Sequence, residues 1–291
     1  MMSLAIVSNS ILLLIILLFE RLNGKISLCS FNVRVFGEKK ASDEQVLQIL
    51  VQILKQHDIC FLQEIRDSGG QSILKLMQKL NYGRASRHKY MLSLSRRIGR
   101  SSSKEQYAFI YKKSSLQLRQ AYVYDDRHLA DADQCSCMED VFEREPYVAH
   151  FYTTKAAIHD FILMGIHAKP DNAPWEIAAL KTVYLQATKL FRIQDGIIMG
   201  DLNADCGYMS RSQRAHNPLL KDARFKMLIP DHVDTTTTKT DCAYDRFIAS
   251  GEQMKTKARG ARIFNFTKEF DISDKLSHNV SDHYPIQLNI Y

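Results

Sequence analysis

Residues 196–206 read Gly-Ile-Ile-Met-Gly-Asp-Leu-Asn-Ala-Asp-Cys, and this stretch constrains the fold more than any other. The apolar run from Gly196 to Met199 predicts a buried strand, and the polar residues Asp201 and Asn203 follow it closely. In sheets that are covered by helices, binding and catalytic groups gather where strands end. The stretch therefore predicts a strand of an α/β protein with functional side chains at its C-terminal end.

The same combination of apolar runs and helical patterns recurs along the chain. An amphipathic helix is expected to begin at Ser42, which would form a capping box with Gln45, and others are expected at 73–80 and 174–191. Interleaved strands and helices favour an α/β fold, and the absence of a repeat or a Pro/Gly/Ser-rich linker favours one domain. The predicted strands span 25–33, 59–63, 107–111, 148–152, 161–166, 196–199, 244–249 and 286–290.

Polar residues stand at the ends of several predicted strands. Taken alone, each has an ordinary structural explanation, such as a helix cap or a hydrogen-bonded buried imidazole. Their repeated occurrence at strand ends favours a shared site. These residues are Asn32, Glu64, His167, Asp201, Asn203, Asp282 and His283.

The N-terminus carries an unbroken apolar run from Ile11 to Phe19. The run is shorter than the ~20 residues that span a bilayer, and it has the length of a secretory h-region, although no Lys or Arg precedes it. We predict a signal peptide at residues 1–24, a secreted mature domain at 25–291 and no stable membrane association. The alternative is an uncleaved membrane anchor.

Six cysteines fit an oxidising compartment. Cys206 and Cys242 flank a Thr-rich stretch, and a disulfide between them would close it and stabilise the fold by about 3–4 kcal/mol. Cys135 and Cys137 are separated by one residue, so a bridge between them would form a small, strained ring.

Cys29 and Cys60 lie inside apolar strand-like runs. We expect buried free thiols at both positions, and the two strands could be neighbours. A metal site made only of cysteines is not expected, because no second close pair has the usual spacing. The formal net charge of +7 favours a polyanionic partner, although a solvated basic surface explains it equally well.

Several segments resemble those of the deoxyribonuclease I family, in the same order over residues 25–291. The Gly-Asp-x-Asn and Ser-Asp-His pieces are shared with abasic-site endonucleases, inositol polyphosphate 5-phosphatases and neutral sphingomyelinases, whereas the others are more specific. The resemblance implies a four-layered α/β sandwich of two packed, mixed, mostly antiparallel sheets flanked by helices. The segments are Phe-Asn-Val-Arg (31–34), Gln-Glu-Ile-Arg-Asp-Ser (63–68), Arg-Glu-Pro (144–146), Gly-Asp-Leu-Asn-Ala-Asp-Cys (200–206), Cys-Ala-Tyr-Asp-Arg (242–246) and Ser-Asp-His-Tyr-Pro (281–285).

The resemblance implies hydrolysis of phosphodiester bonds with two histidines sharing the proton transfers. His283, oriented by Asp245, is the candidate general base. His167, paired with Glu105, is the candidate general acid, and the sequence leaves this division of roles open. Asp201 would position a water or orient His167.

The resemblance also implies divalent cations as cofactors: Mg²⁺ and Ca²⁺, with Mn²⁺ as a substitute. Glu64, assisted by Asp282 or Asp201, is a suitable Mg²⁺ ligand, and Asn32 and Asn203 would donate to the phosphoryl oxygens. The expected calcium ligands form two sets. One is Asp234, Thr236, Thr238 and Thr240; the other is Asp126, Asp140, the carbonyl of Phe142 and Glu145, in a loop longer than the family pattern.

DNA is the expected partner. The family's phosphate- and groove-contacting positions match Arg34, Arg66, Arg144, Tyr208 and Tyr244, and such contacts read little sequence.

Two departures stand out. A groove-stacking Tyr of the family is Ser103 here, and Leu92 and Arg96 replace its actin contacts, which argues against actin binding. We expect a monomer, and candidate glycosylation sites are Asn265, the favoured one, and Asn279.

These features together predict a secreted endonuclease that cleaves double-stranded DNA to 5′-phosphorylated ends. One alternative is another phosphodiesterase of the same superfamily. A second is a catalytically silent secreted protein that binds DNA or another protein.

Overall fold

The computed structural model describes residues 24–126 and 140–291. The predicted leader, apart from Gly24, and the Cys135–Cys137 pair lie outside the described residues. Within those two ranges, none of the helices combines the length and apolarity that crossing a bilayer requires.

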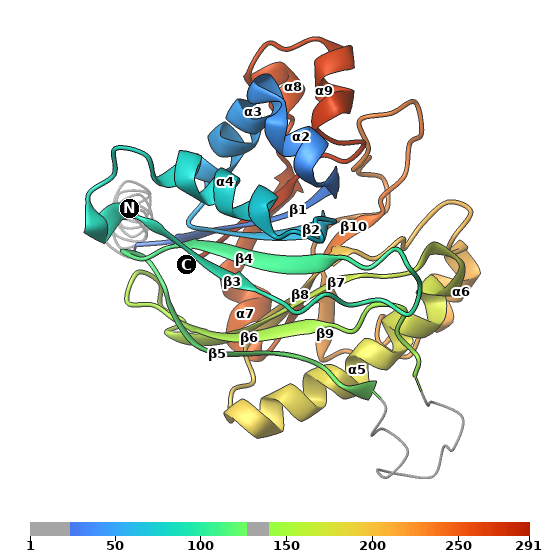
Figure 1. The fold of residues 1–291 in the computed structure, drawn as a ribbon. Coiled ribbons are helices and arrows are strands. Elements are labelled where there is room, and N and C mark those ends of the chain that lie inside the picture. Colours follow the sequence, from blue (N-terminus) through green and yellow to red (C-terminus); the bar gives the residue numbers. More distant parts are fainter. Residues whose placement is uncertain (1–23, 127–139) are drawn as a thin grey trace, which may run out of the picture.

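Two six-stranded sheets form the centre of the molecule (Figure 1). The first sheet has the order β11 (Ala258–Ile263), β12 (Ile286–Ile290), β1 (Ile26–Phe36), β2 (Ile59–Ile65), β4 (Gln106–Lys112) and β3 (Tyr90–Leu94). The second has the order β5 (Gln117–Val123), β6 (Tyr147–Tyr152), β7 (Asp160–His167), β8 (Gly196–Asp201), β10 (Asp245–Ser250) and β9 (Phe225–Met227). Each sheet has one parallel pair, β1–β2 and β7–β8 respectively, and all its other pairs are antiparallel.

Helices cover the outer faces of both sheets (Figure 1). The first sheet is covered by α2 (Glu38–Ser42), α3 (Glu44–Lys55), α4 (Gln71–Asn81), α8 (Phe266–Glu269) and α9 (Asp274–Val280). The long helix α5 (Ala173–Phe191) packs on the second sheet. Short helices α6 (Arg211–His216) and α7 (Glu252–Lys257), with 3₁₀ turns at Ser86–His88 and Pro170–Asn172, complete the described elements. The predicted four-layered α/β sandwich is therefore confirmed.

The core between the two sheets is rich in aromatic side chains. Phe61 and Phe109 of the first sheet lie in one buried cluster with Phe151 and Phe161 of the second. Gly165 makes this close approach possible, because a Cβ at that position would lie 2.1 Å from the Phe61 ring. Burial of this apolar surface holds the sheets together, and so holds the strand ends of both sheets at one place.

Every strand predicted from the sequence is present, but one predicted helix start is wrong. Helix α3 begins at Glu44, not at Ser42, because the Asp43 side chain accepts hydrogen bonds from the backbone N–H groups of Gln45 and Val46. Ser42 instead ends α2, a short helix that the sequence did not indicate. A carboxylate one residue further along provides the cap that the Ser42–Gln45 box would have supplied.

Candidate active site

Three neighbouring strands place polar side chains in one row. His167 at the end of β7 is the register partner of Asp201 in β8, and Asp201 is the register partner of Asp245 in β10. Gly200 permits this arrangement, since its φ is +136° and a Cβ there would lie 1.8 Å from the carbonyl oxygen of Ile166. Asp201 is 2% exposed and stands in the middle of the row.

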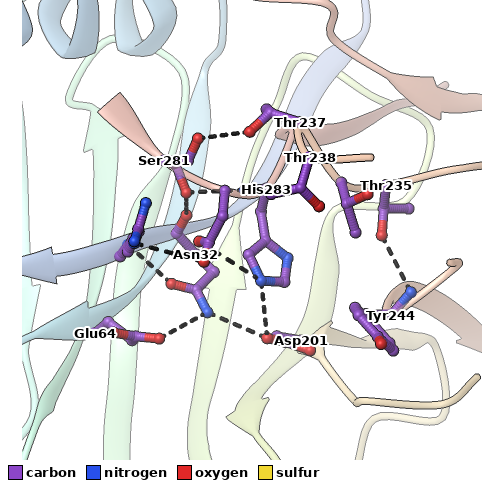
Figure 2. A network of polar contacts seen from close by, with 12 residues as sticks. Asn32, Glu64, Asp201, Thr235, Thr237, Thr238, Tyr244, Ser281 and His283 are labelled. Atoms are coloured by element: carbon purple, nitrogen blue, oxygen red, sulfur yellow. Dashed lines mark hydrogen bonds and ion pairs between the residues drawn. The ribbon is translucent and has the colours of Figure 1, made fainter. Parts of the chain in front are cut away.

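Asp201 lies between the two histidines. Its Oδ2 atom is 3.6 Å from Nε2 of His167 and 3.5 Å from Nε2 of His283. Its Oδ1 atom accepts a hydrogen bond from the backbone N–H of Asn203, at 3.1 Å. Both histidines therefore present Nε2 toward one carboxylate. Figure 2 shows His283 beside Asp201.

His283 lies just before β12 of the first sheet, and the buried carboxylate of Asp245, in β10 of the second sheet, holds it. Its Nδ1 lies 2.7 Å from Oδ2 of Asp245, and because a carboxylate only accepts, the imidazole donates. Burial lowers the pKa of His283, but the charges of Asp245 and Asp201 outweigh burial and raise it to about 10. Ser281 supports the loop: its hydroxyl accepts from the His283 N–H and donates to the Asn32 carbonyl.

His167 forms an equivalent pair with Glu105, which lies just before β4. Nδ1 of His167 is 3.0 Å from Oε1 of the fully buried Glu105. Burial lowers the pKa of His167, but the negative charge of Glu105 has the larger, opposite effect. The pKa of His167 is therefore raised above its ordinary value. Tyr107 and Arg144 fix the backbone here, because the Tyr107 hydroxyl accepts from the His167 N–H and Nε of Arg144 donates to its carbonyl.

The side-chain amide of Asn32 donates hydrogen bonds to both Glu64 and Asp201. Nδ2 of Asn32 lies 3.1 Å from Oε1 of Glu64 and 3.1 Å from Oδ2 of Asp201, as Figure 2 shows. The other Glu64 oxygen accepts the backbone N–H of Val35, at 2.9 Å, and lies 3.7 Å from Nε of Arg66. An ionised carboxylate has about four acceptor positions, so Glu64 keeps capacity for a cation.

This oxygen-rich environment fits Mg²⁺, which prefers hard oxygen ligands. Of the two assistants named from the sequence, Asp201 shares the Asn32 amide with Glu64, whereas Asp282 lies 3.5 Å from Nε of Arg34. A second combination is also present, since ligand atoms of Asp201, Asp245 and His283 lie within 4.8 Å of one another.

The Thr-rich loop brings together the first set of expected calcium ligands. Oγ1 of Thr236 lies 2.8 Å from Oδ1 of Asp234 and 3.0 Å from Oγ1 of Thr240, and the Thr238 hydroxyl also contacts Thr240. The predicted Cys206–Cys242 disulfide is confirmed and closes this segment, with a Cα–Cα distance of 5.9 Å. Convergent oxygens of this kind suit Ca²⁺.

The same loop also contacts the His283 segment. Thr237 donates its backbone N–H to the Asp282 carbonyl and its hydroxyl to the Ser281 carbonyl, both at 2.8 Å. Thr236 and His283 form an isolated antiparallel bridge. An ion that stiffens the loop would therefore also stiffen the segment that carries His283.

The second set of expected calcium ligands is arranged differently. The buried Asp126 carboxylate accepts the backbone N–H of Phe142, at 2.9 Å. Asp140 and Glu145 each pair with an arginine: Asp140 with Arg100 at 3.2 Å, and Glu145 with Arg96 at 2.9 Å. Guanidinium groups thus contact two of the carboxylates that the resemblance assigns to an ion.

The expected DNA-contacting residues differ in exposure. Tyr208 is 40% exposed and its ring lies 5.4 Å from that of Tyr244, next to His283. The side chains of Arg34 and Arg66 are 39% and 28% exposed, whereas Arg144 is buried behind His167 and lies 3.4 Å from Glu105. Ser103 is exposed, two residues before Glu105, and Asn279 is more exposed than Asn265, which caps α8.

Several residues that hydrogen-bond the backbone of the site were not predicted from the sequence. The fully buried Thr235 accepts the backbone N–H groups of Tyr244 and Asp245 through its hydroxyl, and Gln63 accepts the N–H of Asp201. Gln63 and Ser281 lie inside motifs that had already been recognised, so their positions were available. Thr235 lies beside the expected calcium ligands, and Tyr107 lies in an apolar run with nothing to distinguish it.

Comparisons with known proteins agree over most of the chain. Residues 29–283 match the model of the Endonuclease/Exonuclease/phosphatase family. Deoxyribonuclease-1 of Oryctolagus cuniculus is 36% identical over 92% of this chain and 93% of its own length. Deoxyribonuclease gamma of Mus musculus is also 36% identical, over 97% of this chain and 89% of its own.

Solved structures with the same fold are more distant in sequence. A humanized TDP2 of D. rerio aligns with a TM-score of 0.59 at 18% identity and covers 92% of this chain and 99% of its own. The catalytic domain of human Nocturnin aligns with a TM-score of 0.59 at 12% identity, over 92% of this chain and 94% of its own. These two likenesses establish the sandwich architecture.

Proposed function

Because the chain belongs to the deoxyribonuclease I family, within the endonuclease/exonuclease/phosphatase superfamily, we propose that it is a secreted endonuclease for double-stranded DNA. The proposed reaction leaves 5′-phosphorylated ends, depends on Mg²⁺ and Ca²⁺, and has little sequence preference. The observation that carries the proposal is the pair of buried His–carboxylate contacts that converge on Asp201.

Hydrolysis of a phosphodiester needs one proton removed from the attacking water and one delivered to the leaving 3′ oxygen. The Nδ1 atoms of His167 and His283 are each engaged by a carboxylate, so only the Nε2 atoms are available for these transfers. In the proposed mechanism, neutral His283 accepts the proton of the water and protonated His167 donates to the leaving oxygen. Asp201, next to both Nε2 atoms, orients the attacking water.

Negative charge grows on the phosphoryl oxygens as water attacks. Glu64, with Asp201 beside it, would hold a Mg²⁺ ion that neutralises this charge when bound. Asn32 is bonded to both carboxylates, and Asn203 donates its amide to the Ala168 carbonyl, at 2.9 Å. Their placement at the site supports a role as donors to the phosphate once DNA displaces part of this network.

Phosphate contacts outside the reacting group would come from Arg34 and Arg66, which flank Glu64 and Asp282. Tyr208 and Tyr244 offer aromatic faces on the opposite side of His283. Contacts of both kinds position DNA without reading base edges, which supports the proposed lack of sequence preference.

A plasmid assay tests the proposal. The secreted protein is incubated with supercoiled plasmid, Mg²⁺ and Ca²⁺ from pH 5 to 8, and nicked circles with 5′-phosphorylated ends are expected. EDTA should stop the reaction, and His283→Ala serves as the matched inactive control. Uncut plasmid across this range, cleavage that EDTA leaves unchanged, or hydrolysis of sphingomyelin without cleavage of DNA would overturn the proposal.

A further inference from the structure

Two cysteines and a histidine meet inside the first sheet, away from the proposed active site. Cys29 in β1 and Cys60 in β2 are register partners, and both are buried free thiols, as the sequence indicated. Their side chains belong to the apolar layer beneath α3 and α4, with Leu50. Successive side chains of a strand point to opposite faces of the sheet. Asn32 is three residues after Cys29 in β1, so its amide lies on the opposite face from this cluster.

His57 completes the cluster from the turn between α3 and β2. One potential ligand atom from each of Cys29, His57 and Cys60 lies within 4.8 Å of the other two. His57 is 1% exposed, yet its Nε2 atom has no hydrogen-bond partner. Buried polar atoms in proteins nearly always have a partner, so an unpaired nitrogen on an imidazole that lies beside two thiols indicates a missing ligand.

The chemistry of the three side chains favours a thiophilic cation. Thiolate and imidazole are common ligands of Zn²⁺, so His57 can supply the third ligand that a site made only of cysteines would lack here. Zn²⁺ binds thiolates, which requires loss of the thiol proton.

We propose that Cys29, His57 and Cys60 form a zinc site. Zn–S and Zn–N bonds of about 2.3 and 2.0–2.1 Å place the ligand atoms of a tetrahedral site roughly 3.5–3.8 Å apart. The three ligand atoms lie within 4.8 Å of one another, which is compatible with this spacing. A surface cavity of about 600 Å³ is lined by His57, Ser27, Gln56 and Phe264. Of the three cluster residues, His57 borders the cavity, so an ion and a water ligand would reach the cluster from the side of the imidazole.

A zinc ion at this position would join β1 to β2 directly below the strand ends that carry the site. Cys29 precedes Asn32 by three residues, and Cys60 precedes Glu64 by four. The ion would thus be a cross-link in the sheet whose strand ends hold those two side chains, chemically distinct from the oxygen ligands on the other face.

Zinc content and a cobalt spectrum test the proposal. The protein secreted from cells is dialysed without chelator, and its zinc is measured per chain by elemental analysis. Stoichiometric zinc is expected, together with a thiolate-to-metal charge-transfer band when Co²⁺ replaces it. Oxygen and imidazole ligands give no such band, so ions bound at the proposed active site do not mimic it.

Matched variants identify the ligands. Cys60→Ala and His57→Gln should each lose the zinc and weaken or abolish the band. The Cys135→Ser/Cys137→Ser double variant and His159→Gln, which changes an exposed histidine elsewhere, should retain both. Absence of the band in the wild-type protein overturns the proposal even if a cluster variant fails to fold. Mass-spectrometric detection of a Cys29–Cys60 disulfide as the secreted form overturns it as well.

Discussion

Nδ1 of His283, in the segment that leads into β12 of the first sheet, lies 2.7 Å from Oδ2 of Asp245 in β10 of the second sheet. Asp201 adds a second carboxylate 3.5 Å from the other ring nitrogen. Two carboxylates on one buried imidazole stabilise its protonated form, which explains why the pKa of His283 rises to about 10. The free protein therefore carries a charged His283 at neutral pH, whereas the proposed base must be neutral.

The first prediction concerns pH and stability. Because the folded pKa of His283 is raised above the ordinary value of about 6.5, its contribution to stability is complete below pH 6.5 and is lost as pH rises toward 10. Asp245→Asn should flatten this part of the pH dependence. Urea unfolding of both proteins between pH 6 and 10 measures the difference. Parallel pH profiles would contradict the prediction.

The first prediction extends to divalent cations, which should act on the same histidine. Positive charge near Glu64 and Asp201 opposes protonation of His283, so Mg²⁺ should lower its pKa toward neutrality and make a neutral imidazole available. NMR titration of the His283 ring with and without Mg²⁺ measures this shift, and the exposed His232 provides a control resonance. An unchanged His283 titration would remove this link between the cation and the base.

The second prediction concerns turnover. His167→Ala and His283→Ala should each lower kcat by about 10²–10⁴-fold, the range for loss of a general acid or base. DNA affinity should change little, because each imidazole is mostly enclosed by carboxylates and neighbouring backbone. Single-turnover cleavage and a binding assay in EDTA separate the two effects. A variant with near-normal kcat would exclude that histidine from proton transfer.

The third prediction compares Arg34 and Arg144, which the sequence analysis both assigned to DNA contact. Arg34 is exposed beside Asp282, whereas the buried Arg144 donates to the His167 carbonyl and lies next to Glu105. Arg34→Ala should weaken DNA binding and reduce its salt dependence, while Arg144→Ala should mainly lower kcat. Binding measured across a salt series, together with kcat, tests this contrast. Equal effects of the two substitutions on both quantities would contradict it.

The fourth prediction concerns the Thr-rich loop. Reduction of Cys206–Cys242, or removal of Ca²⁺, should expose residues 234–241 to protease before global unfolding, since each constraint closes this segment. Activity should fall in parallel, because Thr237 donates its backbone N–H to the Asp282 carbonyl next to His283. Limited proteolysis with mass-spectrometric mapping identifies the cut. Unchanged cleavage after both treatments would show that neither constraint holds the loop.

The fifth prediction concerns Ser103, which is exposed near Glu105 at the edge of the site. Ser103→Tyr would supply a flat face for stacking on DNA and should lower KM by about tenfold or less, equivalent to at most about 1.4 kcal/mol. It should also make activity less sensitive to salt, while kcat stays nearly constant. Ser103→Ala is the matched control. If KM and the salt response do not move, this position does not touch DNA.

The strands that could and could not be predicted occupy different places in the sheets. The missed strands β3, β5, β9 and β11 are the edge strands of the two sheets. Central strands are buried on both faces and appear in the sequence as apolar runs. Edge strands such as β5, whose residues are exposed or half-buried, have no such apolar run. Register and sheet order depend on contacts between distant segments, which local patterns do not encode.

The candidate site shows a similar division. Strand-end polar residues and motif matches located the histidines and their carboxylates, since those residues carry the chemistry. The supporting residues were harder: Thr235 and Tyr107 matter only through backbone groups that folding brings within reach. The cluster at Cys29 likewise required the parallel pairing of β1 with β2, which no sequence spacing specifies.

The central pairs of the site join one sheet to the other: His167 with Glu105, His283 with Asp245, and Asn32 with Asp201. A partly folded chain in which only one sheet has formed possesses none of these pairs. Recovery of cleavage during refolding should consequently lag behind recovery of secondary structure and coincide with burial of the aromatic layer around Phe61. The enzyme would thus remain harmless during synthesis without any inhibitory segment, because its activity appears only at the last stage of its own assembly.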